Sequence, residues 1–253
     1  MVHLKALPGA PAFDGAFERV LEAALDDARA LEAGGVDAIL LENFGDTPFY
    51  PDSLPPETVA AMARVLGALA EQVTVPLGVN CLRNDARSAV GLCATGEASF
   101  FRVNVHTGAT VTDQGLLEGR AFETLRERDR LAPGAALLAD VQVKHGRPLA
   151  ERTLLEEAKD TWFRGRADAL VVSGVATGAP PSQLDLETLT RDVPEALVYV
   201  GSGLSLENAS DLLSLAHGAI VGTALKVDGD VSAPVDVERV RKLAEAFADQ
   251  RPS

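Results

Sequence analysis

The sequence predicts a (β/α)8 barrel, the TIM-barrel architecture, because eight short apolar runs alternate with eight amphipathic stretches from end to end. A length of 253 residues also suits one barrel of this kind. No linker, charge block or low-complexity segment divides the sequence. We therefore expect residues 1–253 to form a single domain.

The predicted strands are rich in Val, Ile, Leu and Ala, as parallel strands buried on both faces are. The first begins almost at Met1, so it is either a very short strand or one that starts before the sequence given. In order, we expect strands at 2–7, 36–42, 75–80, 99–103, 136–141, 168–173, 197–201 and 219–222.

A helical pattern of apolar residues follows each predicted strand. The segment LEAGGVDAILLEN, residues 31–43, shows the change of pattern: a helix stops at two glycines and a strand follows. In order, we expect helices at about 14–33, 56–72, 85–95, 118–130, 153–164, 184–192, 205–216 and 235–248.

The chain is acidic, with 37 acidic against 23 basic residues and a formal net charge of −14. This charge argues against nucleic acid and anionic membrane surfaces as partners, because both attract Lys and Arg. Only five of the basic residues are lysines. Such a surface suits a high-salt cytoplasm, although ordinary acidic bacterial proteins share it, so both sources stay open.

The sequence shows no signal that directs the chain into or across a membrane. Its apolar runs are shorter than the roughly 20 residues of a transmembrane helix, and MVHLKALPGAP, residues 1–11, lacks the apolar core of a signal peptide. Cys81 and Cys93 match neither a metal-binding nor a redox spacing. We expect a soluble cytoplasmic protein, and the sequence leaves a homo-oligomer open.

Glycines follow both of the last two predicted strands, in VYVGSG (198–203) and VGT (221–223). A glycine after a strand allows either a plain turn or the close approach of a ligand to the backbone. In TIM barrels phosphate commonly binds after strands seven and eight, at the N–H groups of loops and helix starts. Glycines at both places favour the ligand. We predict phosphate contacts at Gly201, Ser202, Gly203, Gly222 and Thr223.

Polar residues close most of the other strands, which is unusual for buried positions. Each of these residues also has a simpler structural explanation. Arg102 and Asp140 could form a structural ion pair, the histidines could lie in solvent-exposed loops, and the asparagines could cap loops. Their convergence on one rim of the barrel favours a site instead. We predict substrate contacts at His3, Asn80, Arg102, Asn104, His106, Ser173 and Thr177.

Asp140, Gln142 and Lys144 lie at alternate positions, so an extended chain would direct all three the same way. We expect the chain to stay extended through Val143, with Lys144 nearer the substrate and Asp140 one layer deeper. A carboxylate beside a lysine suits proton transfer, and a lysine can also form a Schiff base with a carbonyl. Asp140, Lys144 and Glu42 are the catalytic candidates.

The sequence contains no His, Cys and Asp set at metal-ligand spacing, no Ser-His-Asp set and no Walker pattern. We predict no cofactor. A divalent ion held by Asp113, Asp140 or Glu42 stays open, although no spacing supports it.

Long motifs resemble the BtpA family, which includes SgcQ-type proteins. They are MVHLKALPGAP, GVDAILLENFGDTPF, PLGVNCLRND, FFRVNVHTGATVTDQGLLEG, LLADVQVKH, VVSGVATG and VGSGLSLENASDLL…AIVGTALKVDG. The resemblance spans nearly the whole chain, except that members usually carry a few residues before the position of Met1. It implies a TIM barrel with a phosphate site. The family name comes from a role in accumulating photosystem I in cyanobacteria, and other members are often described as predicted enzymes.

Together these features predict an enzyme that acts on a small phosphorylated metabolite, either a sugar phosphate or a nucleoside-derived one. Isomerase and lyase chemistry are slightly favoured, and cleavage of a glycosidic bond also fits. Two alternatives stay open. One is an assembly or stability factor for a membrane complex such as photosystem I, and the other is a non-catalytic binder of a phosphorylated metabolite.

Overall fold

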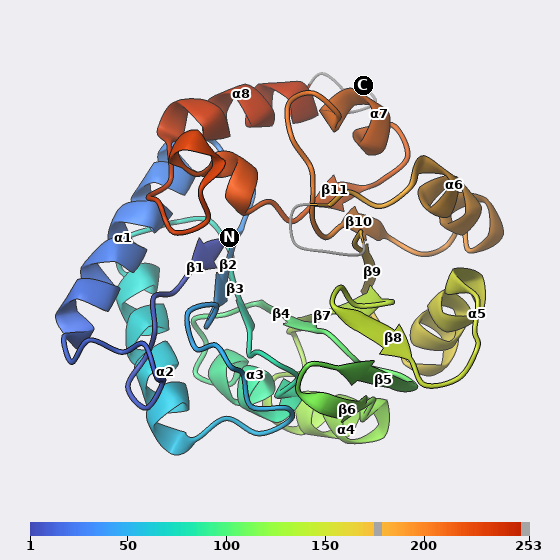
Figure 1. Cartoon of the computed structure of the whole chain (residues 1–253), viewed down its shortest axis with the longest axis horizontal. Helices are drawn as coiled ribbons and strands as arrows, with labels where there is room; N and C mark the ends of the chain where they lie inside the picture. Colours follow the sequence, from blue (N-terminus) through green and yellow to red (C-terminus); the bar gives the residue numbers. More distant parts are fainter. Residues whose placement is uncertain (175–178, 249–253) are drawn as a thin grey trace.

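Eight parallel strands curl into a barrel in the computed structural model, which describes residues 1–174 and 179–248 (Figure 1). Neighbouring strands pair in the order β1-β2-β3-β4-β7-β9-β10-β11, and each lies within or beside a predicted range. The TIM-barrel prediction is confirmed. The strands are Val2–His3 (β1), Ile39–Glu42 (β2), Leu77–Asn80 (β3), Phe100–Val103 (β4), Ala136–Val141 (β7), Ala169–Val172 (β9), Val198–Val200 (β10) and Gly218–Ala219 (β11).

Helices surround the barrel on its outer face (Figure 1). Each falls near its predicted range, and α1 ends where Gly35 adopts a φ of 91°, at the predicted Gly-Gly stop. In the described part of the chain, no helix is long and apolar enough to span a bilayer. The helices are Phe17–Ala33 (α1), Pro56–Ala70 (α2), Ala86–Cys93 (α3), Ala121–Leu131 (α4), Leu154–Lys159 (α5, continued by a π turn at Asp160–Arg164), Gln183–Asp192 (α6), Ala209–Leu213 (α7) and Val237–Ala248 (α8).

The main apolar core lies between the strands and the helices. Leu41, Val79 and Phe101 on neighbouring strands are fully buried in it, together with Leu31 of α1 and Leu66 of α2. Because side chains alternate across a strand, the residue after each of these strand positions faces the inside of the barrel. Only the strand residues that alternate with these core residues can therefore line a site inside the barrel.

One row of paired residues crosses the first four strands near their carboxyl ends. His3 pairs with Glu42, Glu42 with Asn80, and Asn80 with Arg102. All four were predicted as site residues from their places at strand ends. The strand register sets these polar side chains side by side inside the barrel.

Two contacts hold the last strand and its following loop against the first elements. The Met1 nitrogen donates a hydrogen bond to the Val221 carbonyl oxygen over 2.9 Å. Beyond β11, the buried Lys226 forms an ion pair with Asp27 of α1, and Asp27 Oδ1 also accepts the Val235 N–H over 2.7 Å. The loop after β11 is thereby attached to the opposite end of the sequence.

A second, antiparallel sheet was not predicted. It consists of Ala109–Thr112 (β5), Gly115–Glu118 (β6) and Gly146–Pro148 (β8), in the order β6-β5-β8. These strands come from the segments that follow β4 and β7, so the sheet lies beside the carboxyl ends of those strands (Figure 1). Leu117 of β6 forms a small apolar cluster with Val105, which precedes β5, and Val143, which precedes β8.

Candidate functional site

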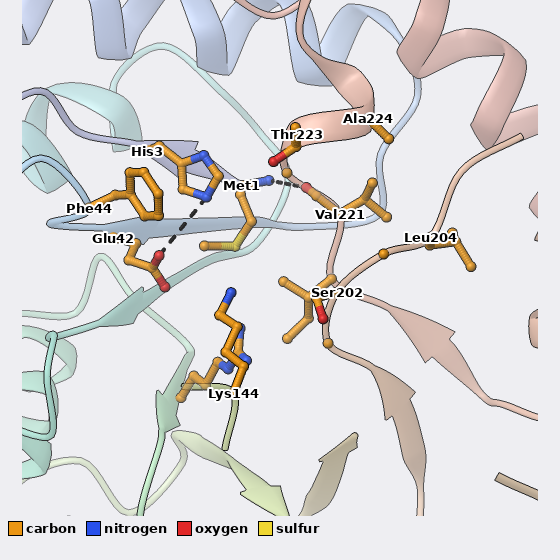
Figure 2. A pocket seen from close by; sticks show the side chains of 15 residues that line it. Met1, His3, Glu42, Phe44, Lys144, Ser202, Leu204, Val221, Thr223 and Ala224 are labelled. Carbon is orange, nitrogen blue, oxygen red and sulfur yellow. Dashed lines mark hydrogen bonds and ion pairs between the residues drawn. The ribbon is translucent and has the colours of Figure 1, made fainter. Parts of the chain in front are cut away.

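A pocket opens among the carboxyl ends of the strands and holds about 490 Å³, counting the part open to solvent. Figure 2 shows its polar groups facing a shared space. The lining residues are Met1, His3, Glu42, Phe44, Arg102, Lys144, Gly201, Ser202, Gly203, Leu204, Ile220, Val221, Gly222, Thr223 and Ala224.

The pocket joins both predicted glycine loops to four of the predicted polar residues, His3, Glu42, Arg102 and Lys144. Other predicted residues support these from behind. Asn80 holds Glu42, while Asn104 and Asp140 lie beside Arg102. Thr177 lies outside the described residues.

In the described part of the chain, the two loops present backbone N–H groups without partners. Among the described residues, none accepts a hydrogen bond from the N–H groups of 202–204 or 222–224. Residues 223 and 224 open a short 3-10 helix, Thr223–Leu225, whose first N–H groups have no partner within the helix. Donors of this kind suit an anion.

The loop glycines are explained by the protein's own packing. Gly203 has a φ of 73°, and a Cβ there would collide with the backbone of Ala179 and Pro180. A Cβ on Gly222 would come within 2.5 Å of His3 Cε1. The glycines are therefore not evidence for a ligand by themselves, and the free N–H groups are the stronger observation.

Ser173 lies under this loop. A Cβ on Gly201 would come within 2.5 Å of the Ser173 hydroxyl oxygen. That hydroxyl is buried and has no hydrogen-bond partner among the described residues. Ser173 does not line the pocket itself.

A buried ion pair forms one wall of the pocket. Arg102 Nε donates to Asp140 Oδ1 over 2.8 Å, and a terminal Arg102 nitrogen donates to Oδ2 over 3.0 Å. Asn104 Nδ2 also donates to Oδ2 over 2.8 Å. Burial alone would lower the pKa of Arg102, but the charges of Asp140 and Glu42 raise it above its ordinary value. Arg102 is therefore a fixed cation, and both Asp140 oxygens are occupied.

Glu42 faces the pocket with one free oxygen. Its Oε2 accepts a hydrogen bond from Asn80 Nδ2 over 2.7 Å, and its Oε1 lies 3.9 Å from His3 Nε2. The His3 ring packs on Phe44 with 4.5 Å between centroids. Burial, with help from nearby cations that include Lys226 and Lys144, lowers the pKa of His3 to about 3. His3 is thus neutral where it lies beside Glu42.

Lys144 enters the pocket, but not along the extended path that we predicted. β7 ends at Val141, and Gln142 has a φ of 55°, so the chain turns there. The turn lets Val143 join the apolar cluster under the second sheet and leads into β8. The expectation of an extended chain through Val143 was wrong, because burial of Val143 outweighs continuation of the strand.

Arg83 is a buried cation that sequence reasoning missed. Its terminal nitrogen donates to the Lys144 carbonyl oxygen over 2.7 Å and so holds the turn in place. Arg83 follows β3 in the segment CLRND, and no local pattern marks it as part of a site. Burial lowers the pKa of Arg83. Burial also lowers the pKa of Lys144. The nearby cations Arg102 and Arg83 add to that lowering, whereas Glu42 and Asp140 oppose it.

His106 lies away from the pocket. Its Nε2 donates to the Gly165 carbonyl oxygen over 2.8 Å, and the residue is 1% exposed. Burial lowers its pKa. The structure gives His106 a place in packing after β4, so it does not contact the space where a substrate would lie.

The described residues contain no group of three or more His, Cys, Asp or Glu side chains placed to share a metal ion. Asp113, one of the carboxylates considered from the sequence, lies in the β5–β6 turn and accepts a hydrogen bond from Gln114. It therefore does not join Glu42 and Asp140 in such a group.

A second hollow lies toward the amino ends of the strands. It runs between the barrel interior and α8, and its walls include Leu40, Phe100, Leu138, Tyr199 and Phe247. These side chains are mainly apolar. The pocket at the carboxyl ends, which gathers the charged groups, is therefore the candidate active site.

The family model for the BtpA family matches residues 1–249. The chain belongs to the BtpA family. It is 44% identical to the photosystem I biogenesis protein BtpA of Synechocystis sp., over 98% of this chain and 87% of that protein. It is also 37% identical to the sgc region protein SgcQ of Escherichia coli, over 97% of this chain and 91% of that protein.

Solved structures share the fold of this BtpA-family chain at low sequence identity. Orotidine 5'-phosphate decarboxylase from Pyrococcus horikoshii is 14% identical with a TM-score of 0.60, and the match covers 92% of this chain and 96% of that one. Phosphoribosyl anthranilate isomerase from Thermus thermophilus is 16% identical with a TM-score of 0.57, over 90% and 95% of the two chains. These likenesses establish the TIM-barrel fold.

Proposed function

We propose that this protein is an enzyme that acts on a small phosphorylated metabolite, a sugar phosphate or a nucleoside-derived phosphate. The observation that carries the proposal is one pocket lined both by residues 202–204 and 222–224 and by Lys144. Among the described residues, neither these backbone N–H groups nor the Lys144 amine has a hydrogen-bond partner. The backbone N–H groups suit a phosphate, and the Lys144 amine suits chemistry on the rest of the substrate. The fold relatives named above have names that state phosphorylated substrates, which is consistent with this use of the barrel.

Within this proposal Lys144 and Glu42 move a proton on the substrate, because both line the pocket and each keeps a free polar atom. Isomerase and lyase reactions are favoured, since each needs a proton moved near a carbonyl group. Asp140 is a positioning residue here, because both of its oxygens are bonded to Arg102 and Asn104. His3 and Arg102 complete the wall around the substrate.

Thermal unfolding with inorganic phosphate, then with sugar phosphates and nucleotides, tests the binding. A ligand at about a hundred times its dissociation constant adds about 2.7 kcal/mol to the free energy of unfolding, which such a measurement resolves. Thr223→Asp places a negative charge at the proposed site, and Thr95→Asp places the same charge on an exposed turn after α3. We expect phosphate to stabilise the wild type and Thr95→Asp, but not Thr223→Asp. Equal stabilisation of both variants would contradict the site.

The name of the cyanobacterial relative supports a second candidate, an assembly or stability factor for a membrane complex. Such a role needs no free lysine in a polar pocket. Co-sedimentation of both the wild type and Lys144→Met with membranes would support this assembly role. Loss of turnover in that variant on a substrate found by thermal screening would support the enzyme, whereas binding without turnover would indicate a phosphometabolite binder.

A further inference from the structure

Lys144 differs from the other lysines of the chain in its surroundings. Its carbonyl oxygen accepts the hydrogen bond from Arg83, but its amine has no hydrogen-bond or ion-pair partner among the described residues. Lys226 is also buried, yet it is paired with Asp27. The remaining lysines, Lys5, Lys159 and Lys242, are exposed. Lys144 therefore has the one lysine amine that lines the pocket without a partner in the described structure.

Burial favours the neutral form of Lys144, and the charges around it act in both directions. Arg102, from β4, is held by Asp140, and Arg83, from the loop after β3, is held by the Lys144 carbonyl, so neither cation can move away. Glu42 and Asp140 act in the opposite direction, and the balance with burial lowers the Lys144 pKa. A desolvated lysine beside other cations is the setting in which an amine becomes a nucleophile at neutral pH.

Glu42 supplies a proton carrier in the same pocket. Its Oε2 accepts a hydrogen bond from Asn80, while among the described residues Oε1 has only the neutral His3 ring nearby, at 3.9 Å. Figure 2 shows Lys144 reaching into the space between Glu42 on one side and Ser202 on the other. A molecule with its phosphate at the 202–204 and 222–224 N–H groups would extend across the Lys144 amine toward Glu42.

We propose that Lys144 forms a Schiff base with a phosphorylated aldehyde or ketone, and that Glu42 carries the proton for this step. The proposal rests on the phosphate site described under Proposed function. Glu42 takes a proton from the Lys144 ammonium, and the nitrogen lone pair bonds to the carbonyl carbon. The carbonyl oxygen then takes one proton from the nitrogen and one from Glu42 and leaves as water. The products are an iminium on Lys144, an ionised Glu42 and one water molecule.

Reductive trapping tests this step. Glycolaldehyde phosphate with sodium borohydride would reduce the iminium to a stable secondary amine, located by intact mass and peptide mapping. We expect one adduct per chain, at Lys144, formed faster than at any exposed lysine, because burial lowers the pKa of Lys144 and leaves more of its amine unprotonated. Lys144→Met should lose that adduct, while slow labelling of Lys5, Lys159 and Lys242 is unchanged.

Two comparisons separate failure of this inference from failure of the phosphate site. Inorganic phosphate should slow labelling of Lys144, and unphosphorylated glycolaldehyde should label it more slowly than the phosphorylated form. Phosphate-dependent stabilisation without an adduct at Lys144 would overturn the Schiff base and leave the phosphate site intact. Labelling of Lys144 at equal rates by both aldehydes would support the amine and contradict the phosphate site.

Discussion

Arg102 and Asp140 form a two-pronged ion pair between the neighbouring strands β4 and β7, with nitrogen–oxygen distances of 2.8 and 3.0 Å. Both side chains are almost completely buried, at 3% and 1% exposed. A carboxylate held in this way fixes the guanidinium and has little capacity left to accept a proton from a substrate. Arg102 and Asp140 therefore shape the pocket, and the groups that react with a substrate must be other residues.

We expect Asp140→Asn to lower the free energy of unfolding by about 3–5 kcal/mol, because it leaves Arg102 buried without its counter-charge. Asp14→Asn is the matched control, since Asp14 pairs with Arg19 at the surface with both side chains more than half exposed. The control should change stability by about 1 kcal/mol or less. Urea unfolding of both variants measures the difference, and similar losses would contradict the importance of the buried pair.

Lys144→Met should leave the melting temperature unchanged or slightly raised, because the lysine amine has no partner to lose among the described residues. Turnover of a substrate found by thermal screening should fall about a hundredfold or more, as loss of a general acid or base usually causes. Melting and turnover measured on the same preparation test both halves. A large fall in melting temperature with turnover retained would assign Lys144 a structural role.

Gly203→Ala should destabilise the protein by more than Gly229→Ala. Both glycines have positive φ, 73° and 69°, so both variants carry the strain of about 1 kcal/mol or more that a side chain meets there. Only at Gly203 would the new methyl group also collide with backbone, that of Ala179 and Pro180. Chemical denaturation measures the free energy of unfolding of both variants, and the difference between them reports the cost of the collision at Gly203. Equal losses would show that the 179–180 segment moves aside at little cost.

Acidification should destabilise the protein through its buried histidines. Burial lowers the pKa of His3 to about 3 and also lowers that of His106, so the unfolded chain binds protons that the folded chain does not. For His3 this stability is present above pH 6.5, its unfolded value, and is lost as the pH falls from there toward about 3. His106→Gln should flatten the dependence of melting temperature on pH below neutrality. An unchanged dependence would show that the pKa of His106 is the same in the folded and the unfolded chain.

High salt should stabilise the fold if the acidic composition reflects a salt-rich cytoplasm. The net charge of −14 opposes compaction, and added ions screen that repulsion. We expect the melting temperature to rise between about 0.1 and 2 M KCl by more than that of a neutral barrel, because salt also strengthens apolar burial in general. A flat or falling curve would remove the halophile prediction.

The sequence by itself determined the barrel and the end of the barrel where the polar residues gather. Its strand signals are local, because a short apolar run such as the one within residues 39–42 is typical of a strand buried on both faces and can be recognised without knowing the rest of the fold. Once strands and helices alternate, the parallel sheet brings the carboxyl ends together, and His3, Glu42, Asn80 and Arg102 follow into one row. The division of the chain into one domain and its oligomeric state stay predictions.

Only the tertiary structure decided which of these side chains are free to react. Asp140 is occupied because Arg102, 38 residues away in sequence, reaches both of its oxygens. Lys144 enters the pocket through a turn at Gln142 that depends on distant apolar contacts of Val143 and on a hydrogen bond from Arg83, 61 residues away. Periodicity reports which face of an element is buried, whereas the direction of a side chain beyond a strand end depends on contacts made by residues far apart in the chain.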